Sequence, residues 1–163
     1  MNFQARQLLF VGIVVAVSTP LLGCQRQPTA DIQPAQTSGE SFQISGDYEL
    51  HYNAVRSDSL QPDIARAYGI ERSKNKVLLN ISVLNKAGGN SVAGDADVHV
   101  VTRNLNGQVK DITLRRVAEE QAIYYLGEVS FSGAETLVFD ITATPTGSTL
   151  PITASLTREF FAD

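Results

Sequence analysis

Three side chains able to bind a metal ion stand at alternate positions near the middle of the chain, namely Asp95, Asp97 and His99. In an extended segment alternate side chains project from one face, so the two carboxylates and the imidazole would form a row. A zinc site needs three or four converging ligands, and His51 is the only other histidine in the sequence. We therefore favour a solvated strand face as the interpretation, keep a metal site as the alternative, and expect no cofactor.

A second set of polar side chains surrounds a short predicted helix and concentrates hydrogen-bond donors suited to an anion, a carboxylate or the backbone of a partner protein. The set comprises Asn53, Tyr68, Arg72, Ser73, Lys74 and Asn75. Polar loops of this kind also serve as connections whose side chains cap a helix and satisfy loop carbonyls. The loop is our candidate binding site, and the connecting role is the interpretation that we favour.

Motifs that indicate catalysis are missing from the sequence. Nucleophilic catalysis needs a nucleophile, a base and an orienting group, but the chain has no Gly-x-Ser-x-Gly sequence and no cysteine–histidine motif. The glycine-rich stretch of residues 87–94 lacks the Lys-Ser/Thr ending of a phosphate-binding loop. A formal net charge of −4 argues against nucleic acid as a partner, because proteins that bind nucleic acid carry basic patches. We predict that the protein is not an enzyme.

The single cysteine of the chain, Cys24, offers a different chemistry. It follows a Leu-Leu-Gly sequence that resembles the cleavage site of bacterial lipoproteins, whose cysteine thiol carries lipid through a thioether. The apolar run of residues 8–17 is too short for a membrane-spanning helix, which needs about 20 residues. The pattern predicts a signal peptide over residues 1–23 and lipidation of Cys24 rather than a retained signal anchor.

The residue after the cysteine predicts where the anchored protein resides. The residue after the cysteine is Gln25, whereas an aspartate at this place favours inner-membrane retention in enterobacterial lipoproteins. We therefore expect the inner leaflet of the outer membrane, with the protein facing the periplasm. The lipid on Cys24 must supply the membrane affinity, because stable anchoring takes more than one acyl chain and the acidic chain has little attraction for anionic lipid headgroups.

Residues 24–41 are predicted to form a flexible tether. The segment contains Pro28, Pro34 and Gly39 among many Gln, Thr and Ser residues, and it has almost no large apolar side chains. Such a composition cannot bury enough apolar surface to offset the entropy of ordering. A single folded domain is therefore expected over residues 42–163.

Apolar and polar residues alternate from Phe42 onward, which is the period of a strand with one buried face. The first run is expected to be one strand with a bulge at Gly46 and with Phe42, Ile44 and Leu50 on the same face. Turn residues such as Asn106-Gly107 separate the runs. The alternating or apolar runs cover residues 42–52, 77–83, 96–100, 112–114, 123–126, 137–143 and 150–156. This spacing predicts an all-β fold, an antiparallel β-sandwich that is immunoglobulin-like and has about seven strands, with a small barrel as the alternative.

One segment, residues 60–69, is predicted to be a short helix. Pro62 suits its first turn, and Gly69 suits the left-handed conformation that follows a helix. Ile64 and Tyr68 are four residues apart and would pack the helix against the sandwich. We expect this helix between the first two strands, where it would cover an open edge or one end of the sandwich.

Several short sequences are shared with a known family. They are Tyr52-Asn53-Ala54, Pro62, Ala65, Tyr68-Gly69-Ile70, Arg72-Ser73-Lys74-Asn75, Leu79-Asn80-Ile81-Ser82-Val83, Tyr124-Tyr125 and Glu159-Phe160-Phe161. Through them the chain resembles a proteobacterial envelope family termed domain of unknown function 4426. The resemblance covers residues 42–163, supports the predicted fold and location, and implies no activity or cofactor.

Two functions fit these observations. The first is a membrane-anchored, periplasm-facing lipoprotein that acts as a non-enzymatic binding or accessory module for another envelope protein. The second is a periplasmic module for a small ligand, an anion or a metal ion, held by the loop of residues 72–76 or by the row of Asp95, Asp97 and His99.

Overall fold

The computed structural model describes residues 41–162 of the chain. The predicted signal peptide, Cys24 and all of the predicted tether except Ser41 lie outside the described residues. Within residues 41–162 no helix is long and apolar enough to cross a membrane. The strands are β1 (Ser41–Ser45), β2 (Tyr48–Arg56), β3 (Lys76–Asn85), β4 (Val92–Gly94), β5 (Ala96–Asn104), β6 (Val109–Lys110), β7 (Leu114–Ala118), β8 (Ile123–Ser130), β9 (Ala134–Pro145) and β10 (Ile152–Phe161). The helices are η1 (Ser57–Ser59), α1 (Pro62–Ala67) and η2 (Ala87–Gly89).

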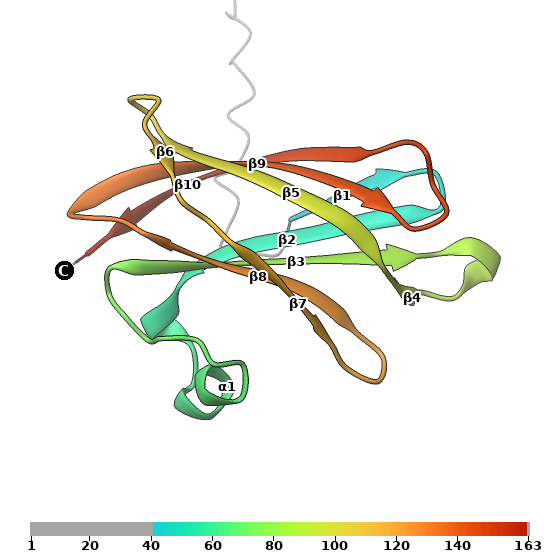
Figure 1. Cartoon of the computed structure of the whole chain (residues 1–163), viewed down its shortest axis with the longest axis horizontal. Helices are drawn as coiled ribbons and strands as arrows, with labels where there is room; N and C mark the ends of the chain where they lie inside the picture. Colours follow the sequence, from blue (N-terminus) through green and yellow to red (C-terminus); the bar gives the residue numbers. More distant parts are fainter. Residues whose placement is uncertain (1–40, 163) are drawn as a thin grey trace, which may run out of the picture. The chain divides into compact units, whose positions relative to one another are not determined.

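The strands form two antiparallel sheets that face each other (Figure 1). The larger sheet has the order β1-β2-β3-β8-β7, with β4 also paired to β3, and the smaller sheet has the order β10-β9-β5-β6. The prediction of an all-β antiparallel sandwich is confirmed, and the sheets do not close into a barrel. The described strands outnumber the seven expected, because two short strands, β4 and β6, carry too few residues to show alternation and the first run divides in two.

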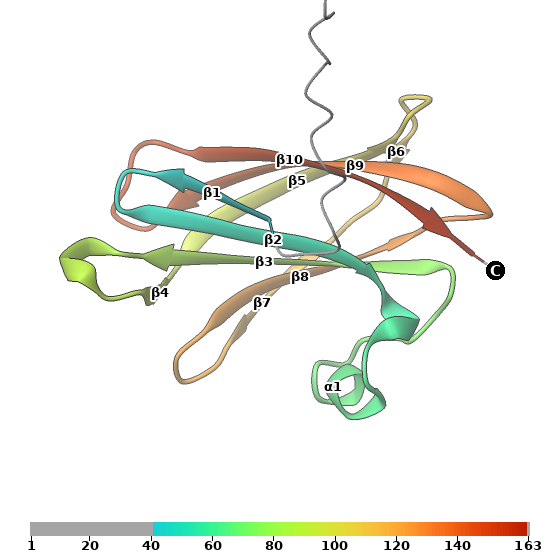
Figure 2. The same ribbon diagram turned by 180° about the vertical axis from the view of Figure 1, so that it is seen from behind.

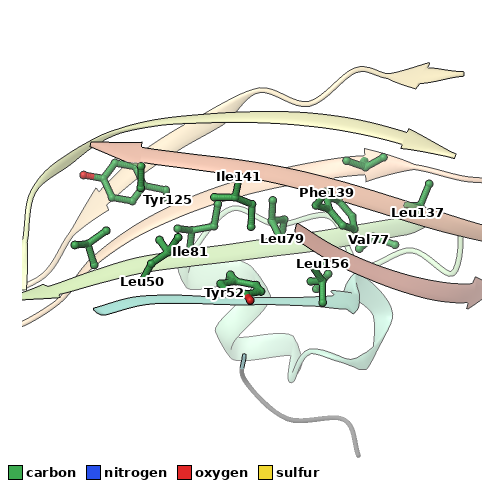
Figure 3. Packing of buried hydrophobic residues seen from close by; sticks show 14 of the residues in the cluster. Leu50, Tyr52, Val77, Leu79, Ile81, Tyr125, Leu137, Phe139, Ile141 and Leu156 are labelled. Carbon is green, nitrogen blue, oxygen red and sulfur yellow. The ribbon is translucent and has the colours of Figure 1, made fainter. Parts of the chain in front are cut away.

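Side chains from the two inner faces pack into one core (Figure 3). Alternate residues of β2, β3 and β8 meet alternate residues of β9 and β10, as the period of two requires. The largest fully buried members are Leu50, Leu79, Ile81, Leu137, Phe139 and Ile141. This shared apolar core is the main source of stability for both sheets.

The first apolar run contains a turn that the alternation conceals. Gly46 adopts a φ of 59° in the turn between β1 and β2, where the sequence predicted a bulge within a single strand. The register pairs Phe42 with His51, so Phe42 and Ile44 lie on the outer face, opposite to the buried Leu50. The prediction that these residues share a face is wrong, because the two-residue turn pairs even-numbered with odd-numbered residues, so that Gln43 rather than Phe42 lies on the face of Leu50.

Helix α1 covers part of the outer face of the larger sheet, on the side away from the smaller sheet (Figures 1 and 2). Ala65 and Ile70 pack there against Leu78 of β3 and Leu126 of β8 in a second apolar cluster. The helix was expected between the first two strands and over an edge or an end of the sandwich. In the chain it lies between those two runs, as expected, because β1 and β2 together occupy the run assigned to the first strand. In space it covers a face of the larger sheet instead of an edge or an end.

The exposed outer face of the smaller sheet differs from that of the larger sheet. Its side chains are mostly hydroxyl-bearing or charged, and Asp140 there binds both Arg103 and Ser155. The outer face of the larger sheet carries aromatic, aliphatic and amide side chains, with Glu49 among them. The main side chains on this second face are Phe42, Ile44, His51, Asn53, Asn80, Ser82, Leu84 and Tyr124.

Candidate binding site

A cleft of about 280 Å³ lies beside helix α1 on the outer face of the larger sheet. The helix segment forms one wall, and strands β3 and β8 form the floor. The lining side chains are Ile64, Tyr68, Ile70, Asn80, Tyr124 and Leu126. Most of these side chains are apolar or aromatic, which is the usual character of a site that takes an organic group.

Tyr68 is the best-fixed side chain in the cleft. It follows the last residue of α1, and its ring meets the ring of Tyr124 edge to face with centroids 6.5 Å apart. Its hydroxyl donates a hydrogen bond to Glu119 Oε1 at 2.6 Å, and its backbone carbonyl accepts one from Arg115. The hydrogen bond to the Glu119 carboxylate raises the pKa of the Tyr68 phenol, so this side chain stays neutral at physiological pH.

Among the side chains that line the cleft, Asn80 is the one that carries an amide group. It pairs in register with Asn53 of β2 and with Leu126 of β8. The Asn80 Oδ1 atom is buried and has no hydrogen-bond partner within residues 41–162. A buried acceptor without a partner costs about 1–3 kcal/mol, so a ligand that brings a donor to this atom would recover part of that energy.

A second hollow of about 260 Å³ shares Leu126 with the cleft. Its floor is formed by Leu78 and Leu126, and its polar lining consists of Asp111, Thr113, Arg115 and Glu128. The hollow therefore combines an apolar floor with one guanidinium and two carboxylates. It extends the candidate surface toward strand β7.

The structure does not gather the predicted loop residues around one site. Arg72 donates to the backbone carbonyl of Asp58 at 2.6 Å, and the Ser73 backbone exchanges hydrogen bonds with the Ser57 hydroxyl. The Asn75 carbonyl accepts from the Phe131 amide at 3.0 Å. These contacts tie the loop to η1 and to the end of β8.

The remaining predicted binding residues lie apart from one another. Asn53 accepts a hydrogen bond from Arg158 of β10 at 3.0 Å, which links the two sheets. Lys74 is exposed, and of the predicted set Tyr68 alone lines the cleft beside α1. The cleft therefore contains one residue of the predicted set, Tyr68.

The row of possible metal ligands is divided between two environments. Asp97 and His99 lie together on the outer face of the smaller sheet, with His99 Nε2 3.4 Å from Asp97 Oδ2. Asp95 instead accepts hydrogen bonds from Arg116 at 2.8 and 3.0 Å and from the Tyr125 hydroxyl at 2.7 Å. Arg116 first, and then Tyr125, lower the pKa of Asp95. Within residues 41–162 no three His, Cys, Asp or Glu side chains are placed to hold a metal ion.

Sequence analysis did not identify Ile64, Asn80 and Tyr124 as site residues. Ile64 was assigned to packing, whereas 46% of its surface is exposed at the rim of the cleft. The run at residues 123–126 is apolar on both faces, and this was the available signal, since an outward-facing tyrosine on a central strand must meet a covering element or a ligand.

The arrangement defines an all-β sandwich domain with a small, mostly apolar cleft on one outer face. A family model described as domain of unknown function DUF4426 matches residues 42–163, so this chain belongs to that family. The resemblance found in the sequence is thereby confirmed. A comparison with curated proteins gives no match.

Solved structures agree with this assignment. A DUF4426 family protein from Pseudomonas aeruginosa PAO1 is 38% identical, covers 77% of this chain and 97% of its own, and superposes with a TM-score of 0.63. A copper-bound variant of FetP from uropathogenic Escherichia coli strain F11 is 12% identical, covers 74% of this chain and 93% of its own, and has a TM-score of 0.50. The second similarity is one of fold alone.

Proposed function

We propose that this protein is a non-enzymatic, lipid-anchored binding module that faces the periplasm and recognises another envelope protein. Its recognition site is the cleft beside helix α1. The observation that carries the proposal is the buried, unpartnered Oδ1 of Asn80 in a hollow otherwise lined by apolar and aromatic side chains. A partner that inserts an apolar side chain next to a hydrogen-bond donor satisfies both features.

The size of the cleft favours a side chain of a partner protein over a large free ligand. Its volume of about 280 Å³ is at the lower end of the range for small-molecule pockets, about 300–1,000 Å³. Tyr68 is already held by Glu119 and Arg115, so its position costs little entropy on binding. A preformed aromatic wall of this kind suits an anchor residue of a partner.

Support for a non-enzymatic role comes from the placement of the two histidines. His51 lies on the outer face of the larger sheet, and His99 lies on the outer face of the smaller sheet, so these two bases do not converge. Support for the anchor and for the periplasmic location comes from the sequence around Cys24.

A small ligand is the second candidate, and the hollow that contains Arg115 favours it. An organic anion would place its charge on the guanidinium and its apolar part on Leu78 and Leu126. Copper, which is bound to FetP in the solved structure, also takes imidazole and carboxylate ligands, but within residues 41–162 no three such side chains are placed together. The only methionine and cysteine are Met1 and Cys24, so residues 41–162 offer no sulfur ligand.

The proposal is tested by photo-crosslinking in living cells with a photoreactive amino acid at position 64 of the full-length chain. We expect one discrete protein adduct that disappears in Tyr124→Ala and Asn80→Leu variants. The matched control is the Arg72→Ala/Lys74→Ala double variant, which alters the exposed loop and leaves the cleft intact. Circular dichroism and melting temperature establish that each variant is folded.

Each outcome of this experiment has a distinct meaning. An adduct that survives both cleft variants and is lost in the loop variant would move the site to residues 72–75. The absence of any discrete adduct would overturn recognition of a protein through the cleft. A rise in melting temperature with organic anions, lost in an Arg115→Ala variant, would then favour the small-ligand function.

A further inference from the structure

The larger sheet forks beside strand β3. The pairing of β3 with β8 ends at Ile81 and Tyr125, and the pairing of β3 with β4 begins two residues further along, at Val83 and Gly94. Both strands run antiparallel to β3 on the same side, so the start of β8 must turn away to leave room for β4. Figures 1 and 2 show the β7–β8 hairpin diverging from β4.

The fork encloses a cavity of about 410 Å³. Strand β4 and its preceding residue supply one wall through Ser91, Val92 and Ala93. The tip of the β7–β8 hairpin supplies the other wall through residues 119–123. One side of the cavity is therefore the edge of β4 that is not paired with β3, and an unpaired strand edge is what an additional strand can join.

The base of the fork is held rigid by hydrogen bonds. The Tyr125 hydroxyl accepts from the Ala96 amide at 2.7 Å and donates to Asp95 Oδ1 at 2.7 Å, and Arg116 binds the same carboxylate. At the tip, the Glu119 amide donates to the Ala122 carbonyl at 2.8 Å. Both walls are consequently preformed, which lowers the entropic cost of binding.

The chemistry of the walls indicates the kind of segment that fits. Val92 is 60% exposed, and with Ala93 and Ile123 it offers apolar contacts at the cavity. Glu119 and Glu120 place two carboxylates at the hairpin tip, and Glu120 is exposed. Side chains of an added strand alternate between two faces, so apolar residues would meet Val92 and Ile123 while basic residues would meet the glutamates.

We propose that the fork is a second docking surface, which accepts an extended segment of a partner protein that alternates apolar and basic residues. Main-chain hydrogen bonds to the β4 or β8 edge hold the segment, and the carboxylate of Glu120 favours a segment with basic side chains. This surface is separate from the cleft beside α1. Only Glu119 joins the two, since its carboxylate accepts the hydrogen bond from Tyr68.

The test measures fluorescence anisotropy of labelled synthetic hexapeptides with the full-length chain in nonionic detergent. We expect a peptide of alternating valine and lysine to bind, with an affinity that falls as salt concentration rises. A valine–glutamate peptide, and a valine–lysine peptide N-methylated at alternate amides, should not bind. The last probe removes main-chain donors and so separates strand pairing from simple charge attraction.

Substitutions place the binding on the fork. Val92→Lys and Glu120→Lys should each weaken the affinity by about tenfold through charge repulsion. The matched control is Val101→Lys, because Val101 is 54% exposed on the outer face of the smaller sheet. Ile64→Lys, which obstructs the cleft beside α1, should leave peptide binding unchanged. The cleft proposal and the fork proposal are therefore tested independently of each other.

Three results would overturn the fork proposal. They are equal binding of the lysine and glutamate peptides, unchanged binding after N-methylation, and an equal loss of affinity in Val92→Lys and Val101→Lys. Melting temperatures of the variants distinguish a lost contact from a lost fold.

Discussion

At the scale of single residues, the buried tyrosine Tyr125 joins the two sheets. Its hydroxyl contacts Asp95 and the backbone of Ala96, where the chain passes from β4 in the larger sheet to β5 in the smaller one. Burial first, and then the Asp95 carboxylate, raise the pKa of this phenol. The side chain is thus a neutral link rather than a proton carrier.

Removing this hydroxyl should destabilise the fold. We expect Tyr125→Phe to lower the free energy of unfolding by about 1–2 kcal/mol, because the Ala96 amide and Asp95 lose a partner. Urea unfolding followed by circular dichroism measures the change. Tyr124→Phe is the matched control on the outer face, and its effect should stay below about 0.5 kcal/mol. Equal effects of the two substitutions would contradict the role of Tyr125.

Asp95 should make the fold sensitive to acid. Its pKa in the folded protein is lowered by Arg116 and Tyr125, so the unfolded chain takes up a proton at a higher pH than the folded chain does. Stability from this group is present above the unfolded pKa of about 3.9 and is lost as the pH falls through the folded value. Asp95→Asn should lower the urea midpoint at pH 7 and flatten its decline below about pH 4.

The exposed neighbour provides the control for that measurement. Asp97→Asn changes the charge of the chain by the same amount on a solvated face, so it should retain the acid profile of the wild-type protein. An identical profile for Asp95→Asn and the wild type would show that the Arg116 contact contributes nothing to acid sensitivity.

At the scale of elements, the close packing of β7 against β8 depends on Gly127. A Cβ atom at this position would lie 2.8 Å from side-chain carbons of Ile112 and Leu114. We expect Gly127→Ala to cost about 1–3 kcal/mol through overpacking, measured by urea unfolding. In Gly94→Ala the nearest contact, to Val83, is 3.4 Å, so this control should cost less.

The strands of this fold were predictable from the sequence because burial of one sheet face imposes a period of two. Asn106-Gly107 was correctly assigned to a turn, and Gly107 has a φ of 79°. The Gly46 turn was missed because the apolar Phe42 and Ile44 lie on the outer face, so the alternation in the sequence continues across the turn although the buried face changes. The surface that helix α1 covers was also missed, since an apolar helix face does not specify which surface it will cover.

The candidate site was less predictable than the fold. Tyr68 was identified through its place in a polar, family-like segment, but Asn80 lies among alternating strand residues and looks like any polar outward position. Its significance arises from Tyr68 and Tyr124, which are distant in sequence from it and from each other. The polar loop of residues 72–75 attracted attention in the sequence, yet its donors mostly bind neighbouring backbone.

At the scale of the whole described domain, the two sheets should unfold together because they share one core. All five tyrosines lie on the larger sheet or next to α1, and the chain has no tryptophan. Tyrosine fluorescence therefore reports on the larger sheet and on the core that this sheet shares with the smaller one. We expect Leu156→Ala in β10 of the smaller sheet to lower stability by about 2–5 kcal/mol and to shift the fluorescence and circular-dichroism transitions equally.

A shift confined to circular dichroism would contradict this cooperativity. It would mean that the smaller sheet can unfold while the tyrosine-bearing sheet remains. Thr153→Ala, an exposed substitution on the same strand, is the control and should move neither transition by more than about 0.5 kcal/mol.

The proposed anchor makes a prediction for the entire chain. Cys24→Ser should abolish incorporation of an alkyne-labelled fatty acid and move the protein from the membrane fraction to the soluble periplasmic fraction, because the lipid supplies the membrane affinity. A Ser41→Ala variant serves as the control. Membrane association of Cys24→Ser equal to that of the wild type would contradict lipid anchoring through this residue.

The fork in the larger sheet has a consequence for protein engineering. Pairing between β3 and β8 stops at Tyr125, so the length of the hairpin tip has no effect on the register of the central strands. Extra residues placed between Glu120 and Gln121 should be tolerated, because exposed hairpin tips accept insertions with little cost in loop entropy. An epitope or a reporter peptide grafted there would leave both chain ends unmodified, which matters for a protein whose amino-terminal cysteine is expected to carry lipid.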